Sequence, residues 1–130
     1  MTLDIVEAPY NHEPNRGFSL REMVLLAVGT PAAPLSIDEA YHAFQALVSQ
    51  LRNKFPYHIP SQKTFEEFIE KLARKGVLDS TNIRTEDGRQ IHTYFLSDIG
   101  FKEYQNILDE MASSVRFVDA IKFIRKSFWD

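Results

Sequence analysis

Apolar residues recur three or four positions apart in three successive segments between Ser19 and Gly76. This spacing places them on one face of an α-helix, where they can pack against a core. A serine or threonine precedes each segment, and a glutamate follows it three residues later. That is the spacing of a capping box, in which two side chains satisfy free N–H groups at the start of a helix. The pattern predicts three helices, which run from Ser19 to about Val28, from Ser36 to about Phe55, and from Ser61 or Thr64 to about Lys75.

After Gly76 the apolar period changes from helical to alternating. We expect one strand over residues 77–85 and a returning strand over residues 89–96, because Glu86-Asp87-Gly88 between them is a strong hairpin-turn signal. Two strands alone are marginally stable in water, so the hairpin is expected to pack against the helices.

Two more amphipathic helices follow the hairpin, one starting at Ser97 and the other after Ser113-Ser114. Residues 1–18 read as an N-terminal arm, in which residues 3–7 are either a short strand or part of a partly ordered tail. The expected domains are therefore the arm at 1–18, a central domain at 19–97 and C-terminal helices at 98–130. The expected fold class is α+β, mainly α with a small β-hairpin. Three helices, a hairpin and a helix is the order of a winged helix-turn-helix, here with additional C-terminal helices.

Residues 64–78, TFEEFIEKLARKGVL, run from a helix through a lysine-glycine-aliphatic ending into a strand. Residues 92–100, HTYFLSDIG, lead from the returning strand into the next helix. With Asp87-Gly88-Arg89 between them, these segments resemble the recognition helix and wing of winged-helix regulators of the PadR and MarR kind. The resemblance covers about a third of the chain. It implies a DNA-binding protein that acts as a transcriptional regulator.

The chain departs from PadR proteins at its second helix, where their histidine-glycine-tyrosine element is replaced by Ser36-Ile37-Asp38-Glu39-Ala40-Tyr41. The same pattern also resembles the winged-helix domains of origin-recognition proteins and of scaffolding proteins that bind no DNA. The alternative function is therefore a non-enzymatic protein-interaction module in a replication-initiation or scaffolding assembly. Such a module would dock a protein partner through the third helix or the terminal helix.

If the chain binds double-stranded DNA, the resemblance implies that the third helix inserts its N-terminal residues into the major groove, while the wing reaches the backbone or minor groove. A glutamine can read adenine through two hydrogen bonds, a lysine can reach guanine or phosphate, and hydroxyls can hold phosphate. The candidate DNA-binding residues at the helix start are Ser61, Gln62, Lys63 and Thr64. Those of the wing are Arg84, Arg89 and His92.

The charge of this reading unit weighs against DNA. Residues 61–97 carry six basic and six acidic side chains, so their net charge is zero, and the whole chain carries −3. Glu66, Glu67 and Glu70 lie on the helix face away from the apolar residues, where they repel phosphate, although a carboxylate can accept from cytosine N4. A solvated surface with Glu67–Lys71 and Glu70–Arg74 pairs is the other interpretation of this face.

The terminal helix carries more apolar side chains than a minimal winged helix needs to cover. They either fold back onto the domain's own core or meet a second copy across a two-fold interface, and we expect a homodimer. The candidate dimer-interface residues are Phe117, Ile121, Ile124, Phe128 and Trp129.

Other classes of function have little support in the sequence. The chain has no cysteine, which removes disulfides, thiolate metal ligands and a cysteine nucleophile. Its four histidines show no paired metal-ligand spacing, and no phosphate-binding loop or nucleophile elbow is present. We therefore expect no enzyme, no metal and no cofactor. No apolar run approaches the roughly 20 residues that cross a bilayer, so we expect no membrane partner and a cytoplasmic location, or a nuclear one in a eukaryote.

Overall fold

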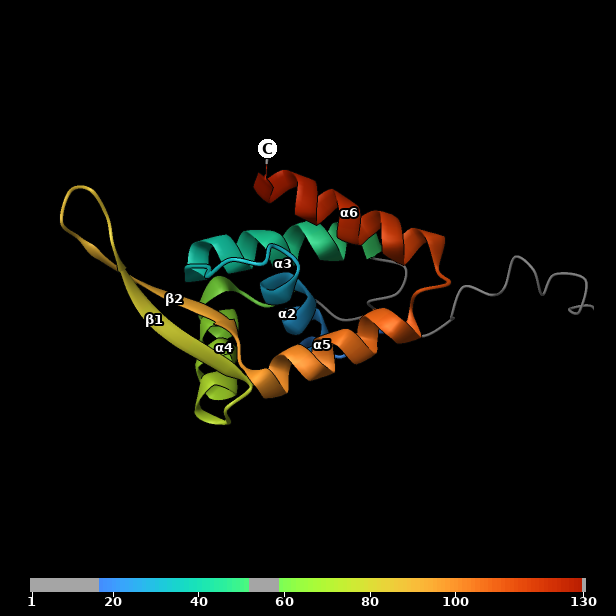
Figure 1. Cartoon of the computed structure of the whole chain (residues 1–130), viewed down its shortest axis with the longest axis horizontal. Coiled ribbons are helices and arrows are strands. Elements are labelled where there is room, and N and C mark those ends of the chain that lie inside the picture. Colours follow the sequence, from blue (N-terminus) through green and yellow to red (C-terminus); the bar gives the residue numbers. More distant parts are fainter. Residues whose placement is uncertain (1–16, 52–58, 130) are drawn as a thin grey trace, which may run out of the picture.

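The structure is a computed structural model that describes residues 17–51 and 59–129, except for the side chain of Trp129. Within these residues the helices and the hairpin follow in the predicted order, and the α+β fold class is confirmed (Figure 1). The predicted end of the second helix near Phe55 and the strand considered at residues 3–7 lie outside the described residues. The elements are α2 (Leu20–Gly29), α3 (Ile37–Leu51), α4 (Gln62–Arg74), β1 (Leu78–Arg84), β2 (Gln90–Leu96), α5 (Asp98–Glu110) and α6 (Val115–Trp129).

Serine caps fix the helix starts. Before α2, the Ser19 hydroxyl accepts the Glu22 N–H at 3.1 Å while the Glu22 carboxylate accepts the Ser19 N–H at 3.0 Å, so the predicted capping box is confirmed. The box predicted at Ser36 forms in the same way before α3. At α4 the cap is Ser61, whose hydroxyl accepts the Thr64 N–H at 3.2 Å. The sequence offered Ser61 and Thr64 as caps for this helix, and the structure shows that Ser61 is the cap.

Helix α2 is the centre of the core. Its residues from Met23 to Val28 are all buried, as their almost unbroken apolar character predicted. Figure 1 shows α2 between α3 on one side and α5 on the other, with α6 lying across α3, and the residue contacts join the same pairs of helices. Phe18, which the sequence placed in the arm, is also buried and stacks on Phe117 of α6, with ring centroids 5.8 Å apart. The boundary at residue 18 was therefore wrong, because this core begins before Ser19.

The turn from α4 into the hairpin is a glycine C-cap. Gly76 has a φ of +80°, which favours glycine, and the Val77 N–H donates to the Leu72 carbonyl at 3.0 Å. This is the 6→1 hydrogen bond of a Schellman motif. It confirms Gly76 as the residue that ends α4 and directs the chain into β1.

The edge of β2 that does not pair with β1 is joined to the helical part of the molecule by a backbone bridge. Leu35, in the connection between α2 and α3, forms an antiparallel bridge with Tyr94 of β2 through hydrogen bonds of 2.9 and 2.8 Å. β1 and β2 pair in register from Leu78 with Leu96 to Arg84 with Gln90. The middle of β2 is thus held from both edges.

The base of the hairpin is locked to α5 by Ser97 and Gly100. The Ser97 hydroxyl accepts the Gly100 N–H at 3.1 Å and lies 2.6 and 2.8 Å from the carbonyl oxygens of Gly76 and Val77, to which it donates. A Cβ on Gly100 would lie 2.1 Å from the Val77 carbonyl oxygen, so the two backbones meet where no side chain fits.

The variant Gly100→Ala tests this close approach. We expect it to lower the free energy of unfolding by about 1–3 kcal/mol, because the new methyl group must push the hairpin base away from α5. At an unobstructed helical position the same change would raise it by roughly 0.5–1 kcal/mol. The measurement is urea denaturation followed by circular dichroism. Ile99→Ala, at the exposed neighbouring residue, is the control and should stay within about 0.5 kcal/mol of the parent. A stabilised Gly100→Ala protein would contradict the packing.

Candidate nucleic-acid interface

The first turn of α4 presents all four residues that the sequence assigned to its DNA-contacting end. Ser61, Gln62, Lys63 and Thr64 are exposed. They differ in how strongly they are already engaged. The Ser61 hydroxyl caps the helix and also donates to the Thr64 hydroxyl at 3.1 Å, while the Gln62 amide donates to the Asp38 carboxylate of α3. Lys63 forms no ion pair with any residue that the structure describes, so its ammonium group is free to meet an anion.

The three predicted wing residues also lie on the surface, and two of them have partners. Arg84 ends β1, is exposed, and has no carboxylate partner within the described part of the chain. The Arg89 guanidinium forms an ion pair with Asp87 at 2.9 Å (Nε to Oδ2). His92 Nδ1 lies 2.8 Å from the Asn82 side-chain oxygen. Arg84 is therefore the less neutralised of the two wing arginines.

The turn of the hairpin is itself organised by Asp87. Its carboxylate accepts hydrogen bonds from the Thr85 hydroxyl and from the Arg89 backbone N–H. These bonds, the one from Thr85 first, hold the pKa of the Asp87 carboxyl below its usual value. Asp87 therefore joins Thr85 and Arg89 at the turn.

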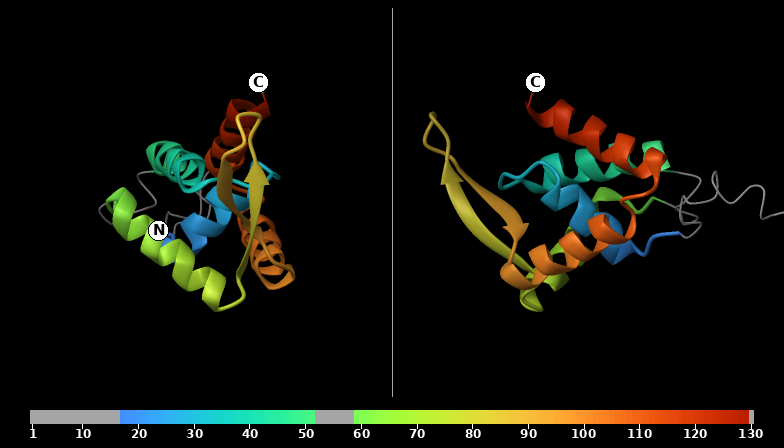
Figure 2. Two further views of the ribbon diagram at one scale, coloured as in Figure 1. Left: turned by 90° about the vertical axis from the view of Figure 1, so that its left-hand side faces the viewer. Right: turned by 45° about the vertical axis from the view of Figure 1, so that its right-hand side comes forward.

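The strand register gives the hairpin two chemically different faces. On one face the pairs are Arg84 with Gln90, Asn82 with His92, and Ser80 with Tyr94, so the outer part of this face is polar. On the other face Ile83 pairs with Ile91 and Thr81 with Thr93. The alternation predicted for the returning strand is confirmed in this pairing. Figure 2 shows the hairpin projecting from the helices, so both faces extend beyond the core.

The polar face of the hairpin lies next to α4. Burial of the Tyr94 side chain raises the pKa of its hydroxyl, and the negative charges of Glu70 and Glu66 on α4 raise it further. These glutamates act on Tyr94 because the exposed face of α4 and the polar face of the hairpin adjoin. The two faces together form the candidate nucleic-acid interface.

Carboxylates occupy much of this candidate interface. Glu66, Glu67 and Glu70 are all exposed on α4, as the sequence predicted. Neither the Glu67–Lys71 pair nor the Glu70–Arg74 pair considered from the sequence forms an ion pair in the described structure. Both sets of charges on α4 therefore stand in solvent, and the negative ones lie between the first turn of the helix and the hairpin base.

The dimer-interface residues predicted on α6 are in the wrong place for an interface. Phe117, Ile121 and Ile124 are 2%, 5% and 0% exposed within one chain, and Phe128 packs on the same core. The physical reason is that α6 lies on α3, so its apolar stripe completes the chain's own core. The side chain of Trp129 lies outside the described residues. The alternative weighed from the sequence, that the stripe folds back, is the one that holds for these four side chains.

Two relationships in this region had no signal in the sequence. The contact between Gln62 and Asp38 joins residues 24 positions apart, and the bridge from Leu35 to Tyr94 rests on one residue between Pro34 and Ser36. The spacing of apolar residues shows which face of a single helix or strand is buried. It carries no information about which residues of two different elements meet.

Comparison of the chain with models of known protein families and with characterised proteins finds no match. The resemblance to winged-helix regulators therefore stays a prediction. Among residues 17–51 and 59–129, no three histidine or carboxylate side chains are grouped so that they could hold a metal ion. No described helix has both the length and the apolar character to cross a bilayer.

The variant Ile124→Ala distinguishes a core residue from an interface residue. We expect it to lower the free energy of unfolding by about 2–5 kcal/mol, because it leaves a cavity between α6 and the core. The midpoint of chemical denaturation should fall equally at low and high protein concentration. Phe123→Ala is the matched control, since the neighbouring Phe123 is 46% exposed, and its effect should be much smaller. A loss of stability in Ile124→Ala that vanishes at high concentration would instead place Ile124 between two chains.

The titration of Tyr94 tests the approach of α4 to the hairpin. We expect the pKa of Tyr94 to lie above its ordinary value of 10.0 and to fall in Glu70→Gln. The measurement is NMR of tyrosine labelled at the ring carbon that bears the hydroxyl. Because the folded pKa is raised, this group's contribution to stability is complete below the ordinary value and is lost as the pH rises through the raised one. Glu67→Gln should leave the titration unchanged, and an equal shift in both variants would contradict the placement.

Proposed function

We propose that the chain is a winged-helix DNA-binding protein that acts as a transcriptional regulator, with the start of α4 in the major groove and the hairpin on the DNA backbone. The observation that carries the proposal is the position of two exposed, unpaired cations. Lys63 lies on the first turn of α4, one turn before Glu66 and Glu67, and Arg84 ends β1 on the polar face of the hairpin. A duplex that meets both faces would find one phosphate or base contact on each.

The two cations have different tasks in this proposal. Lys63 at the helix start reaches guanine or a phosphate oxygen, and the neighbouring Ser61 and Thr64 hydroxyls hold phosphate. Arg84 neutralises a phosphate beside the groove. Arg89 adds less, because its ion pair with Asp87 already balances its charge.

The side chains of Gln62 and His92 each make one hydrogen bond within the protein and keep a further polar atom available to a DNA base. The Gln62 amide nitrogen donates to Asp38, so its side-chain oxygen remains as an acceptor. Reading adenine through two hydrogen bonds uses this oxygen and the second N–H of the amide, so it is compatible with the contact to Asp38. The hydrogen bond from His92 Nδ1 to Asn82 leaves Nε2 directed to other partners.

The glutamates of α4 limit binding to unspecific DNA. Affinity that is independent of sequence comes from phosphate neutralisation, and Glu66 and Glu70 oppose it next to the hairpin. A carboxylate in the groove is compatible with a cytosine, whose N4 amino group donates to it. We therefore propose a protein that binds selected DNA sites and has weak affinity for DNA of random sequence.

A homodimer remains part of the proposal, with a surface different from the buried stripe of α6. Two copies would present two reading units to the two halves of a DNA site. The most exposed apolar side chain on the described part of α6 is Val115, at 71%. We assign Val115 to the contact between copies.

The alternative function is a non-enzymatic protein-interaction module that uses α4 as its docking face. The three exposed glutamates and the engagement of Gln62 with Asp38 favour it, because a basic protein surface would complement the carboxylates that DNA must avoid. In this function Lys63 and Arg84 would have no special role.

Fluorescence anisotropy with labelled double-stranded genomic fragments separates these functions. We expect binding that weakens as salt rises, because each phosphate contact releases counterions. Lys63→Ala and Arg84→Ala should each weaken binding and reduce the slope of log affinity against log salt by about 1. Lys102→Ala, at an exposed lysine of α5, is the matched control and should change neither quantity.

The double variant Glu66→Gln with Glu70→Gln supplies a change of the opposite sign. If α4 faces DNA, removing these charges raises affinity for random fragments at low salt. Absence of salt-dependent binding in the parent and in this double variant would reject DNA binding and leave the protein-interaction function.

A further inference from the structure

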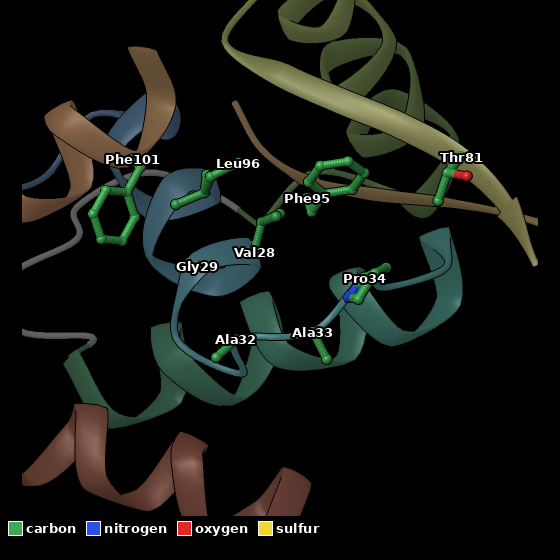
Figure 3. Close-up of a pocket in the computed structure, with 9 residues that line it drawn as sticks. All are labelled: Val28, Gly29, Ala32, Ala33, Pro34, Thr81, Phe95, Leu96 and Phe101. Atoms are coloured by element: carbon green, nitrogen blue, oxygen red, sulfur yellow. The ribbon is translucent and has the colours of Figure 1, made fainter. Parts of the chain in front are cut away.

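A pocket of about 480 Å³ opens between the hairpin, the end of α2 and the start of α5 (Figure 3). Its floor is the C-terminal end of α2 at Val28 and Gly29. One wall is the connection between α2 and α3. The other wall combines both strands of the hairpin with the first turn of α5, where Phe101 stands at the rim.

We propose that this pocket binds a small, uncharged, mainly apolar molecule that carries a ring. The volume lies within the range of about 300–1,000 Å³ that is typical of small-molecule sites. The lining contains no ionisable side chain, and its one side-chain hydroxyl belongs to Thr81. A charged group placed there would lose its hydration without gaining a partner, which excludes ionic ligands.

The aromatic side chains at the rim indicate the ring. Phe101 is 51% exposed although it projects from the same helix as the buried Tyr104, and its ring lies 6.2 Å from that of Tyr104. Phe95 lines the opposite part of the same wall and is half-buried. A flat apolar molecule between the walls would cover both rings, whose faces and edges favour aromatic partners.

The wall formed by the connection between α2 and α3 is fixed before any ligand arrives. At its start the Thr30 N–H donates to the Leu26 carbonyl at 3.0 Å, and the Ala32 N–H donates to the Gly29 carbonyl at 3.2 Å. At its end the Leu35 bridge to β2 holds it. Ala32 has a φ of 59°, an uncommon conformation for a residue with a Cβ, and such residues concentrate at binding sites. The site is therefore preformed, which reduces the entropy lost on binding.

The pocket connects the hairpin with the helical core. Thr81, Phe95 and Leu96 belong to the hairpin, while the other lining residues belong to α2, α5 and the connection after α2. An occupant would touch both parts and restrict their relative movement. An effect of this on DNA affinity rests on the proposed function, whereas binding to the pocket does not.

The test is a fluorescence titration with N-phenyl-1-naphthylamine, an uncharged aromatic probe, in the absence of DNA. We expect saturable binding of one probe per chain. Phe101→Ser should weaken it about tenfold or more, because the ring that covers the probe is lost. Phe123→Ser is the matched control, since Phe123 is about as exposed as Phe101 but lies on α6, and it should bind as the parent does.

A second variant keeps the test valid if Phe101→Ser does not fold. Ala33→Phe, at an exposed wall residue, places a ring in the pocket and should abolish probe binding while leaving the circular dichroism spectrum unchanged. The sulfonated relative 8-anilinonaphthalene-1-sulfonate should bind more weakly than the uncharged probe.

Three results would overturn the proposal. Equal affinity for both probes would reject an uncharged ligand, and equal loss in Phe101→Ser and Phe123→Ser would reject the location. Probe binding that disappears as protein concentration rises, together with a dimer mass in sedimentation equilibrium, would show that a second copy covers the pocket. Because these readouts contain no DNA, a failure here is distinguishable from a failure of DNA binding.

Discussion

The structure depends on one close approach between two stretches of backbone. The Val77 carbonyl, at the start of the hairpin, faces the first turn of α5 at Gly100, and the Ser97 hydroxyl joins them. A two-stranded hairpin has too little buried surface to hold its own position in water. Here its root is fixed to a helix that packs on α2, so the direction in which the hairpin leaves the core is set by backbone contacts. The hairpin contributes to both candidate surfaces, the one beside α4 and the one around the pocket. The position of both therefore depends on this junction.

The hairpin separates two environments because its side chains alternate. The polar pairs adjoin α4 and its charges, and the other face leads through Thr81 and Phe95 into an uncharged pocket. A period-two pattern thus does more than bury half of each strand. In the two proposals above, DNA meets one side of the hairpin and an apolar molecule meets the other.

The sequence predicted those parts of the fold that are set by near neighbours. Capping boxes at Ser19 and Ser36, the glycine that ends α4, and the hairpin turn depend on side chains within a few residues, so their spacing identifies them. Predictions that depended on which elements pack against each other in the core were less accurate. The apolar stripe of α6 has the same spacing whether it meets α3 or a second chain, and only the fold shows that Ile124 meets its own core. The pocket could not be predicted either, because its lining comes from four segments whose meeting is set by Leu35 and Ser97.

The pairing of β1 has a consequence for the protein at high concentration. Within the described part of the chain, β1 pairs with β2 on one edge and with no strand on the other, and all its residues after Leu78 are exposed. An open strand edge is a template on which another molecule can add a strand, and this is a common start of aggregation. The edge is short, at seven residues, and it carries Asp79 near one end and Arg84 at the other. A second hairpin that paired with it would have to bring these charges, with their water, into a growing sheet. The cation that we assign to DNA therefore also keeps the molecules apart in its absence.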